Sequence, residues 1–134
     1  MSRLMPSPNS TTLRGRRILV VEDSYLVAQE LTELLEREGA DVVGPVSTVY
    51  DAERLAREAS RLDAAVLDVN IHGEMVWPVA DILSRRHVRF VFATGYAAAS
   101  IKERYGQVQV VEKPVPARMV ARLLSIELPV AGGL

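Results

Sequence analysis

Four short runs of strand-forming residues each lead into side chains that can carry out chemistry. The runs occupy residues 18–21, 64–67, 88–93 and 108–111. They lead, in this order, into the pair Glu22 and Asp23, into Asp68, into Thr94 and into Lys113. Unbroken apolar runs are typical of parallel strands that are buried on both faces. Ligands of open α/β sheets bind outside the carboxyl ends of the strands, so these polar residues are candidates for one functional site.

Helical patterns separate the strands along the whole chain. Strands are predicted at residues 17–21, 41–46, 64–67, 88–93 and 108–111, and helices at 24–38, 48–60, 77–86, 98–104 and 116–126. This alternation predicts an α/β, flavodoxin-like, doubly wound (βα)5 fold with a five-stranded parallel sheet. Gly44 and Pro45 interrupt the second strand and place it at an edge. The strand order 2-1-3-4-5 satisfies this constraint and brings the ends of the first and third strands together.

Local signals refine the helix boundaries. Apolar residues of the first helix recur at helical spacing, at Leu26, Val27, Leu31, Leu34 and Leu35, and Gly39 is placed to end it. The second helix has the apolar positions Val49, Ala52, Leu55 and Ala56, with Ser47 as its expected cap. Pro78 fits the first turn of the third helix, and residues 70–74 are expected to form a loop.

Composition limits the class of protein. A chain of 134 residues with 49% hydrophobic residues fits one packed domain, and the absence of cysteine excludes disulfides and thiolate metal sites. There is no apolar run of about 20 residues and no secretory signal, so we expect a cytoplasmic protein. The 17 N-terminal residues contain four arginines and no acid, although the net charge is −1. We expect a flexible basic tail at 1–15, a domain at 16–128 and a short tail at 129–134.

The three carboxylates at the first and third strand ends favour a metal site. Glu22, Asp23 and Asp68 would repel one another unless a cation lay between them. An all-oxygen set of ligands points to a hard ion, and Mg²⁺ is the expected one. Asp68 is then a candidate nucleophile that accepts a phosphoryl group as an acyl phosphate. Thr94 and Lys113 offer a hydroxyl and an ammonium group to the phosphoryl oxygens.

This combination of strand ends resembles the receiver domain of bacterial response regulators over about residues 16–128. The resemblance implies that Mg²⁺ is held by Glu22, Asp23, Asp68 and the backbone carbonyl of Asn70. It implies that a sensor histidine kinase or phosphotransfer protein phosphorylates Asp68. Thr94 is then the switch hydroxyl and Lys113 the amine that senses the phosphate. The family commonly has a cis peptide at the position of residues 113–114.

A narrower resemblance concerns residues 90–96, Phe-Val-Phe-Ala-Thr-Gly-Tyr. This segment is similar to the signature of the FATGUY single-domain regulators, whose partners are often kinases of the HWE class. Arg89 stands where that signature has proline, and Val110 stands where typical receivers have a switch aromatic. Output is therefore expected through the loop and helix at residues 94–104. The resemblance also suggests that the side chains of Asn70 and Tyr96 tune dephosphorylation.

The expected function is a stand-alone signalling module that acts by protein–protein contact or as a phosphate sink, without metabolic activity. The expected kinase-facing patch consists of Tyr25, Leu26 and residues 115–117. We expect no nucleic-acid or membrane partner, and a monomer or weak dimer. His72 is interpreted as an exposed loop residue more readily than as an acid–base group.

Two alternatives stay open at this point. The chain could be a degenerate receiver that acts as an unphosphorylated interaction module, which Val110 keeps possible. It could also be a Mg²⁺-dependent phosphotransferase acting on a small molecule. A haloacid dehalogenase type would need a second Asp two residues after the nucleophile, where this chain has Asn70.

Overall fold

The structure is a computed structural model that describes residues 13–95, 101 and 109–112. Five parallel strands form its central sheet, in the order β2-β1-β3-β6-β7. These strands are β1 (Arg17–Val21), β2 (Asp41–Val46), β3 (Ala64–Leu67), β6 (Arg89–Thr94) and β7 (Gln109–Glu112). In chain order this is 2-1-3-4-5, so the predicted flavodoxin-like topology is confirmed.

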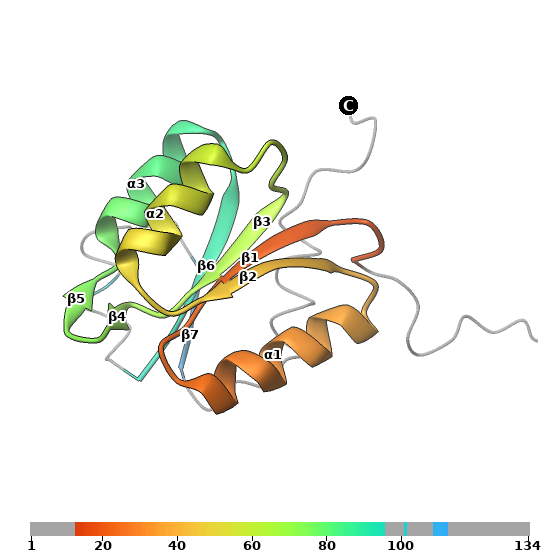
Figure 1. The fold of residues 1–134 in the computed structure, drawn as a ribbon, viewed down its shortest axis with the longest axis horizontal. Coiled ribbons are helices and arrows are strands. Elements are labelled where there is room, and N and C mark those ends of the chain that lie inside the picture. The colour runs from red at the N-terminus through yellow and green to blue at the C-terminus, as the bar shows by residue number, and fades with distance from the viewer. Residues whose placement is uncertain (1–12, 96–100, 102–108, 113–134) are drawn as a thin grey trace, which may run out of the picture.

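Helices cover both faces of the sheet, as Figure 1 shows. On one face lies α1 (Tyr25–Arg37), and on the other lie α2 (Val49–Glu58) and α3 (Trp77–Arg85). Alternate strand residues therefore enter different cores. Leu19 and Leu67 belong to the core under α2 and α3, whereas Val20 and Val66 belong to the core that includes Leu35 of α1. Because both faces are covered, the strand residues are apolar without interruption.

Side-chain caps set where the first two helices begin. Ser24 precedes α1, and its Oγ accepts a 3.4 Å hydrogen bond from the N–H of Val27. Thr48 caps α2, with its Oγ1 accepting from the N–H of Asp51 at 3.1 Å. The prediction of Ser47 as this cap was wrong, because the helix begins at Val49 and the residue directly before it is Thr48. Leu26 was expected on the apolar face of α1, but its side chain is 70% exposed.

Strand β2 is an irregular edge strand, as its Gly-Pro pair predicts. Gly44 has φ of +94°, and its peptide bond to Pro45 is cis. The pairing register of β2 with β1 shifts between Leu19 and Val21. The cis peptide expected at residues 113–114 and the helix expected at 116–126 lie outside the described residues. Of the helix expected at 98–104, only Ile101 is described, and it is helical and buried.

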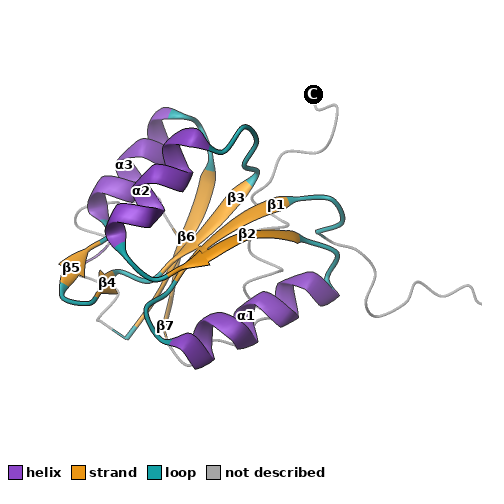
Figure 2. Ribbon diagram, viewed as in Figure 1, coloured by secondary structure: helices purple, strands orange, loops and turns teal. Residues whose placement is uncertain are grey.

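A small antiparallel hairpin follows β3, where a loop was predicted. Its strands are β4 (Asn70–Ile71) and β5 (Glu74–Met75), visible in Figure 2 directly before α3. Only His72 and Gly73 connect them, with φ of +51° and +87°. Positive φ at both central residues is the pattern of a type I′ turn, whose twist matches that of the flanking strands.

The described chain begins with a turn that is part of the packed structure. Leu13 is fully buried, and its N–H donates to the carbonyl of Glu38 at 3.1 Å. The N–H of Gly15 donates to the carbonyl of Gly39, also at 3.1 Å. Residues 13–15 of the expected tail therefore contact the end of α1. Among the described residues, no helix is both long and apolar enough to span a membrane.

Candidate phosphoacceptor and metal site

The site lies at the carboxyl ends of β1 and β3, which pair with each other. Val21 is the register partner of Leu67, so Glu22 and Asp68 follow directly from paired positions. Backbone hydrogen bonds continue one residue beyond the strands. The N–H of Glu22 donates to Val46 O at 3.0 Å, and that of Asp68 donates to Val21 O at 2.9 Å. The sheet itself therefore fixes the backbone of both acidic residues.

Three carboxylates converge at this edge. Glu22, Asp23 and Asp68 each offer one oxygen, and these oxygens lie within 4.8 Å of one another. Glu22 and Asp68 are 4% and 6% exposed, and Asp23 is partly buried. Three negative charges this close together repel one another, and a cation between them would offset that repulsion. An oxygen-only set of this size fits Mg²⁺, which binds few protein groups and retains several waters.

Backbone N–H groups hold each of the three carboxylates. Glu22 Oε2 accepts from the N–H of Ser24 at 3.1 Å, which links it to the cap of α1. Asp68 Oδ1 accepts from the N–H of Asn70 at 3.4 Å. Asp23 Oδ2 accepts from the N–H of His72 at 2.9 Å. Such contacts orient ligand oxygens before any ion binds.

The hairpin supplies a site contact that the sequence interpretation missed. The side chain of His72 is 62% exposed, with Nδ1 3.8 Å from Asp23 Oδ2, and its backbone makes the shorter contact to that oxygen. The side chain of Asn70 also supports the turn, since its Oδ1 accepts from the N–H of Gly73 at 2.7 Å. The signal in the sequence was the pair His72-Gly73, because a glycine in a two-residue connection is typical of tight hairpins.

The remaining candidate residues are placed to different extents. Thr94 is fully buried at the end of β6, next to β3 in the sheet. Its backbone is paired in register with Glu112, the last residue of β7. Lys113 comes directly after that strand and lies outside the described residues, as does Tyr96. The structure thus brings together the three carboxylates, and Thr94 lies at the same edge of the sheet.

Aromatic residues pack behind the end of β6. Phe92 is fully buried and contacts Trp77 edge to face, with ring centroids 5.7 Å apart. Phe90 contacts Phe92 in a similar way at 5.4 Å. Val110, which stands in place of the usual switch aromatic, is paired in register with Phe92 and packs against this core. Phe92 is therefore a core residue, and partly buried Phe90 packs against the same core.

Large apolar side chains are exposed around the site. In the described part of the chain they are Tyr25, Leu26, Tyr50 and Met75. Tyr25 and Leu26 begin α1, directly after the acidic pair, and are 78% and 70% exposed. Tyr50 lies in the first turn of α2 and Met75 in the hairpin. Residues 115–117, the other half of the expected kinase-facing patch, are outside the described residues.

Comparison with known proteins gives a consistent group of relatives. SdrG from Pseudomonas melonis Fr1, solved in its BeF3-activated conformation, is 39% identical; the match covers 81% of this chain and 92% of SdrG, with a TM-score of 0.67. A CheY-like response regulator receiver domain protein from Methanospirillum hungatei superposes with a TM-score of 0.71 at 18% identity, covering 84% of this chain and 93% of that one. No family model matches the sequence.

A curated relative extends beyond the matched region. The transcriptional regulatory protein PdtaR of Mycobacterium tuberculosis is 28% identical over 100 residues. Those residues are 74% of this chain and 48% of PdtaR, so the chain spans about half the length of that relative.

Fold, site and relatives together define the class of protein. The chain belongs to the CheY-like receiver domains of the response regulators of two-component signalling. Domains of this class are signalling modules rather than metabolic enzymes.

Proposed function

We propose that this chain is a phosphoacceptor of a two-component pathway, with Asp68 as the residue that is phosphorylated. The observation that carries the proposal is the convergence of the Glu22, Asp23 and Asp68 carboxylates within 4.8 Å at paired strand ends. Buried Thr94, at the end of the neighbouring strand, supports it. Strand packing alone gives no reason to bury two carboxylates together.

In the proposed reaction, a carboxylate oxygen of Asp68 attacks the phosphorus of a phosphohistidine. The P–N bond breaks, the electron pair leaves with the histidine nitrogen, and that nitrogen is protonated. The product is an acyl phosphate on Asp68. The Thr94 hydroxyl donates a hydrogen bond to a phosphoryl oxygen, and the Lys113 ammonium neutralises part of the charge.

The same residues are proposed to hold Mg²⁺. Glu22, Asp23 and Asp68 would bind it together with the backbone carbonyl of Asn70. When bound, the ion supplies positive charge close to the phosphoryl oxygens. The hydrogen bonds from Ser24 and His72 keep two of the carboxylates oriented, so less reorganisation is needed on binding.

The proposed phosphodonor is a histidine kinase or phosphotransfer protein, and the FATGUY-like segment 90–96 favours a kinase of the HWE class. Exposed Tyr25 and Leu26 adjoin the carboxylates and support this end of α1 as part of the docking surface. Output is proposed to occur through contact with another protein or by competition for phosphate. The proposed domain covers residues 16–128, and residues 13–15 pack against it through buried Leu13.

Intact mass spectrometry tests the proposal. Incubation of the full chain with acetyl phosphate and Mg²⁺ is expected to add about 80 Da, one phosphoryl group. The adduct should be absent from Asp68→Asn and from a sample with excess chelator, but present in Asp63→Asn, a partly buried acid at the opposite end of β3. No adduct on the native chain would contradict the proposal and favour a degenerate receiver.

A further inference from the structure

Ser24 joins the carboxylate site to the first turn of α1 through three hydrogen bonds. Its backbone N–H donates to Glu22 Oε2 at 3.1 Å, and its side-chain Oγ accepts from the N–H of Val27 at 3.4 Å. Its carbonyl accepts from the N–H of Ala28 at 2.9 Å, which is the first bond of the helical ladder. One residue therefore holds both a candidate metal ligand and the start of a helix.

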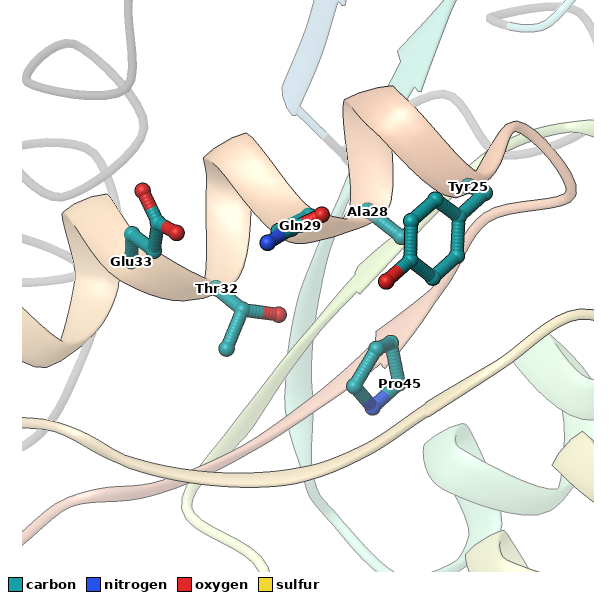
Figure 3. A pocket seen from close by; sticks show the side chains of 6 residues that line it. All are labelled: Tyr25, Ala28, Gln29, Thr32, Glu33 and Pro45. Carbon is teal, nitrogen blue, oxygen red and sulfur yellow. The ribbon is translucent and has the colours of Figure 1, made fainter.

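Side-chain packing contributes little to the position of this first turn. Tyr25 and Leu26, the first two residues of α1, are exposed. Figure 3 shows the ring of Tyr25 beside Pro45 of β2, where both residues line a cavity of about 330 Å³. The first buried residue of α1 is Ala28. The hydrogen bonds of Ser24 are therefore the main restraint on the start of this helix.

The start of α2 offers a comparison within the same chain. Thr48 caps this helix with the same kind of bond, which its Oγ1 accepts from the N–H of Asp51 at 3.1 Å. The first residue of α2, Val49, is buried in the core under α2 and α3, so packing also anchors that turn. Loss of the cap should therefore loosen the start of α1 more than the start of α2.

The charge at the two helix starts also differs. Asp51 lies in the first turn of α2, whereas the first turn of α1 is Tyr-Leu-Val-Ala. The N-terminal end of a helix favours negative charge nearby. At α1, the Glu22 carboxylate that is bonded to Ser24 supplies this charge. The helix start and the orientation of Glu22 therefore stabilise each other.

We propose that the hydroxyl of Ser24 positions Glu22 as a metal ligand. By accepting from Val27, the hydroxyl fixes the backbone of residue 24, whose N–H in turn holds the buried Glu22 carboxylate. This arrangement keeps a Glu22 oxygen within 4.8 Å of those of Asp23 and Asp68. Without the hydroxyl, the first turn frays more easily and the carboxylate can leave the ligand set. The role in Mg²⁺ binding rests on the proposed function, whereas the contact between residues 22 and 24 does not.

Calorimetric titration with Mg²⁺ tests the role in ion binding. Ser24→Ala keeps the backbone N–H and removes the hydroxyl, so the Kd for Mg²⁺ should rise about tenfold, the lower end of the effect of losing a group that orients a ligand. Ser24→Thr keeps a hydroxyl and should bind Mg²⁺ as the native chain does. Thr48→Ala is the matched loss of a cap, and it should lower the unfolding midpoint without changing this Kd.

These variants separate positioning of a ligand from stabilisation of a helix. A cap that served the helix alone would change the unfolding midpoint in Ser24→Ala and leave the Kd for Mg²⁺ unchanged. That result would overturn the proposal. Equal increases of the Kd in Ser24→Ala and Thr48→Ala would also overturn it, because they would show a general effect of reduced stability.

Amide hydrogen exchange tests the contact in the metal-free chain. The amide proton of residue 24 is expected to be protected in the native chain and in Ser24→Thr, and to lose most of its protection factor in Ser24→Ala. Glu22→Ala should have the same effect, because it removes the acceptor. Equal protection in the native chain and Ser24→Ala would overturn the proposal. If the native chain does not bind Mg²⁺, the proposed function is contradicted, and the exchange of this amide then decides the positioning role by itself.

Discussion

The backbone N–H of His72 donates a 2.9 Å hydrogen bond to Oδ2 of Asp23, 49 positions earlier in the chain. This bond joins the hairpin after β3 to the acidic pair after β1. It depends on the turn, because His72 has φ of +51° and Gly73 has φ of +87°. The orientation of one candidate metal ligand is therefore set by backbone conformation in a different loop.

Substitutions of His72 should separate backbone conformation from the imidazole. His72→Gly retains the N–H and accepts positive φ, so Mg²⁺ affinity should stay close to that of the native chain. A β-branched residue disfavours this conformation, so His72→Val should cost about 1–2 kcal/mol of stability and weaken Mg²⁺ binding by up to about tenfold. Urea unfolding and calorimetric titration measure the two effects. Equal loss of affinity in both variants would instead assign the role to the imidazole.

Two glycines of positive φ near the start of the fold should respond differently to alanine. Gly15 has φ of +73°, and the space that an alanine Cβ would occupy there is open, so Gly15→Ala should cost only the conformational penalty, about 1 kcal/mol. At Gly39, with φ of +97°, a Cβ would lie 2.8 Å from the Cα of Arg14. Gly39→Ala should therefore cost about 1–3 kcal/mol more. Similar unfolding midpoints for the two variants would contradict this contact.

Thr94 should matter for the response to phosphorylation more than for folding. Thr94→Val keeps the shape of this fully buried side chain and removes the hydroxyl. We expect the acyl phosphate to form at Asp68 in this variant, while the backbone NMR shifts that BeF₃⁻ induces in residues 94–104 are lost. Thr94→Ser should preserve them, because it retains the hydroxyl. Residues 96–100 and 102–104 lie outside the described structure. If BeF₃⁻ leaves the shifts of residues 94–104 unchanged in the native chain, output through this segment is contradicted.

The exposed first turn of α1 should affect the rate of phosphotransfer from a protein donor but not from a small-molecule donor. Leu26→Asp is expected to slow phosphotransfer from a cognate kinase by about tenfold, the effect of losing an apolar contact of about 1.4 kcal/mol. Labelling by acetyl phosphate should not change, because the carboxylates are untouched. Tyr50→Ala is the matched control, since Tyr50 is 75% exposed and lies on α2. An equal effect of Tyr50→Ala would argue against a docking surface centred on α1.

Most of the fold could be predicted because its signals are local. Four strands of the sheet are apolar runs, and the Gly-Pro pair at residues 44–45 marks the remaining one, β2, as an edge strand. The hairpin after β3 was missed because its strands have two residues each, too few for an alternating pattern. The exposure of Leu26 was also missed. Helical spacing identifies the apolar face of a helix, but it does not show how far along the helix the sheet covers that face.

The sequence by itself determined the order of the strands and the residues that stand at their ends, because both follow from continuous apolar runs and the short-range punctuation between them. Only the tertiary structure decided that the oxygens of Glu22, Asp23 and Asp68 converge within 4.8 Å, that backbone N–H groups orient them, and that Leu13 is buried against the end of α1. These relations join residues that are far apart in the chain. They depend on strand pairing and turn geometry, which no local pattern of side chains encodes.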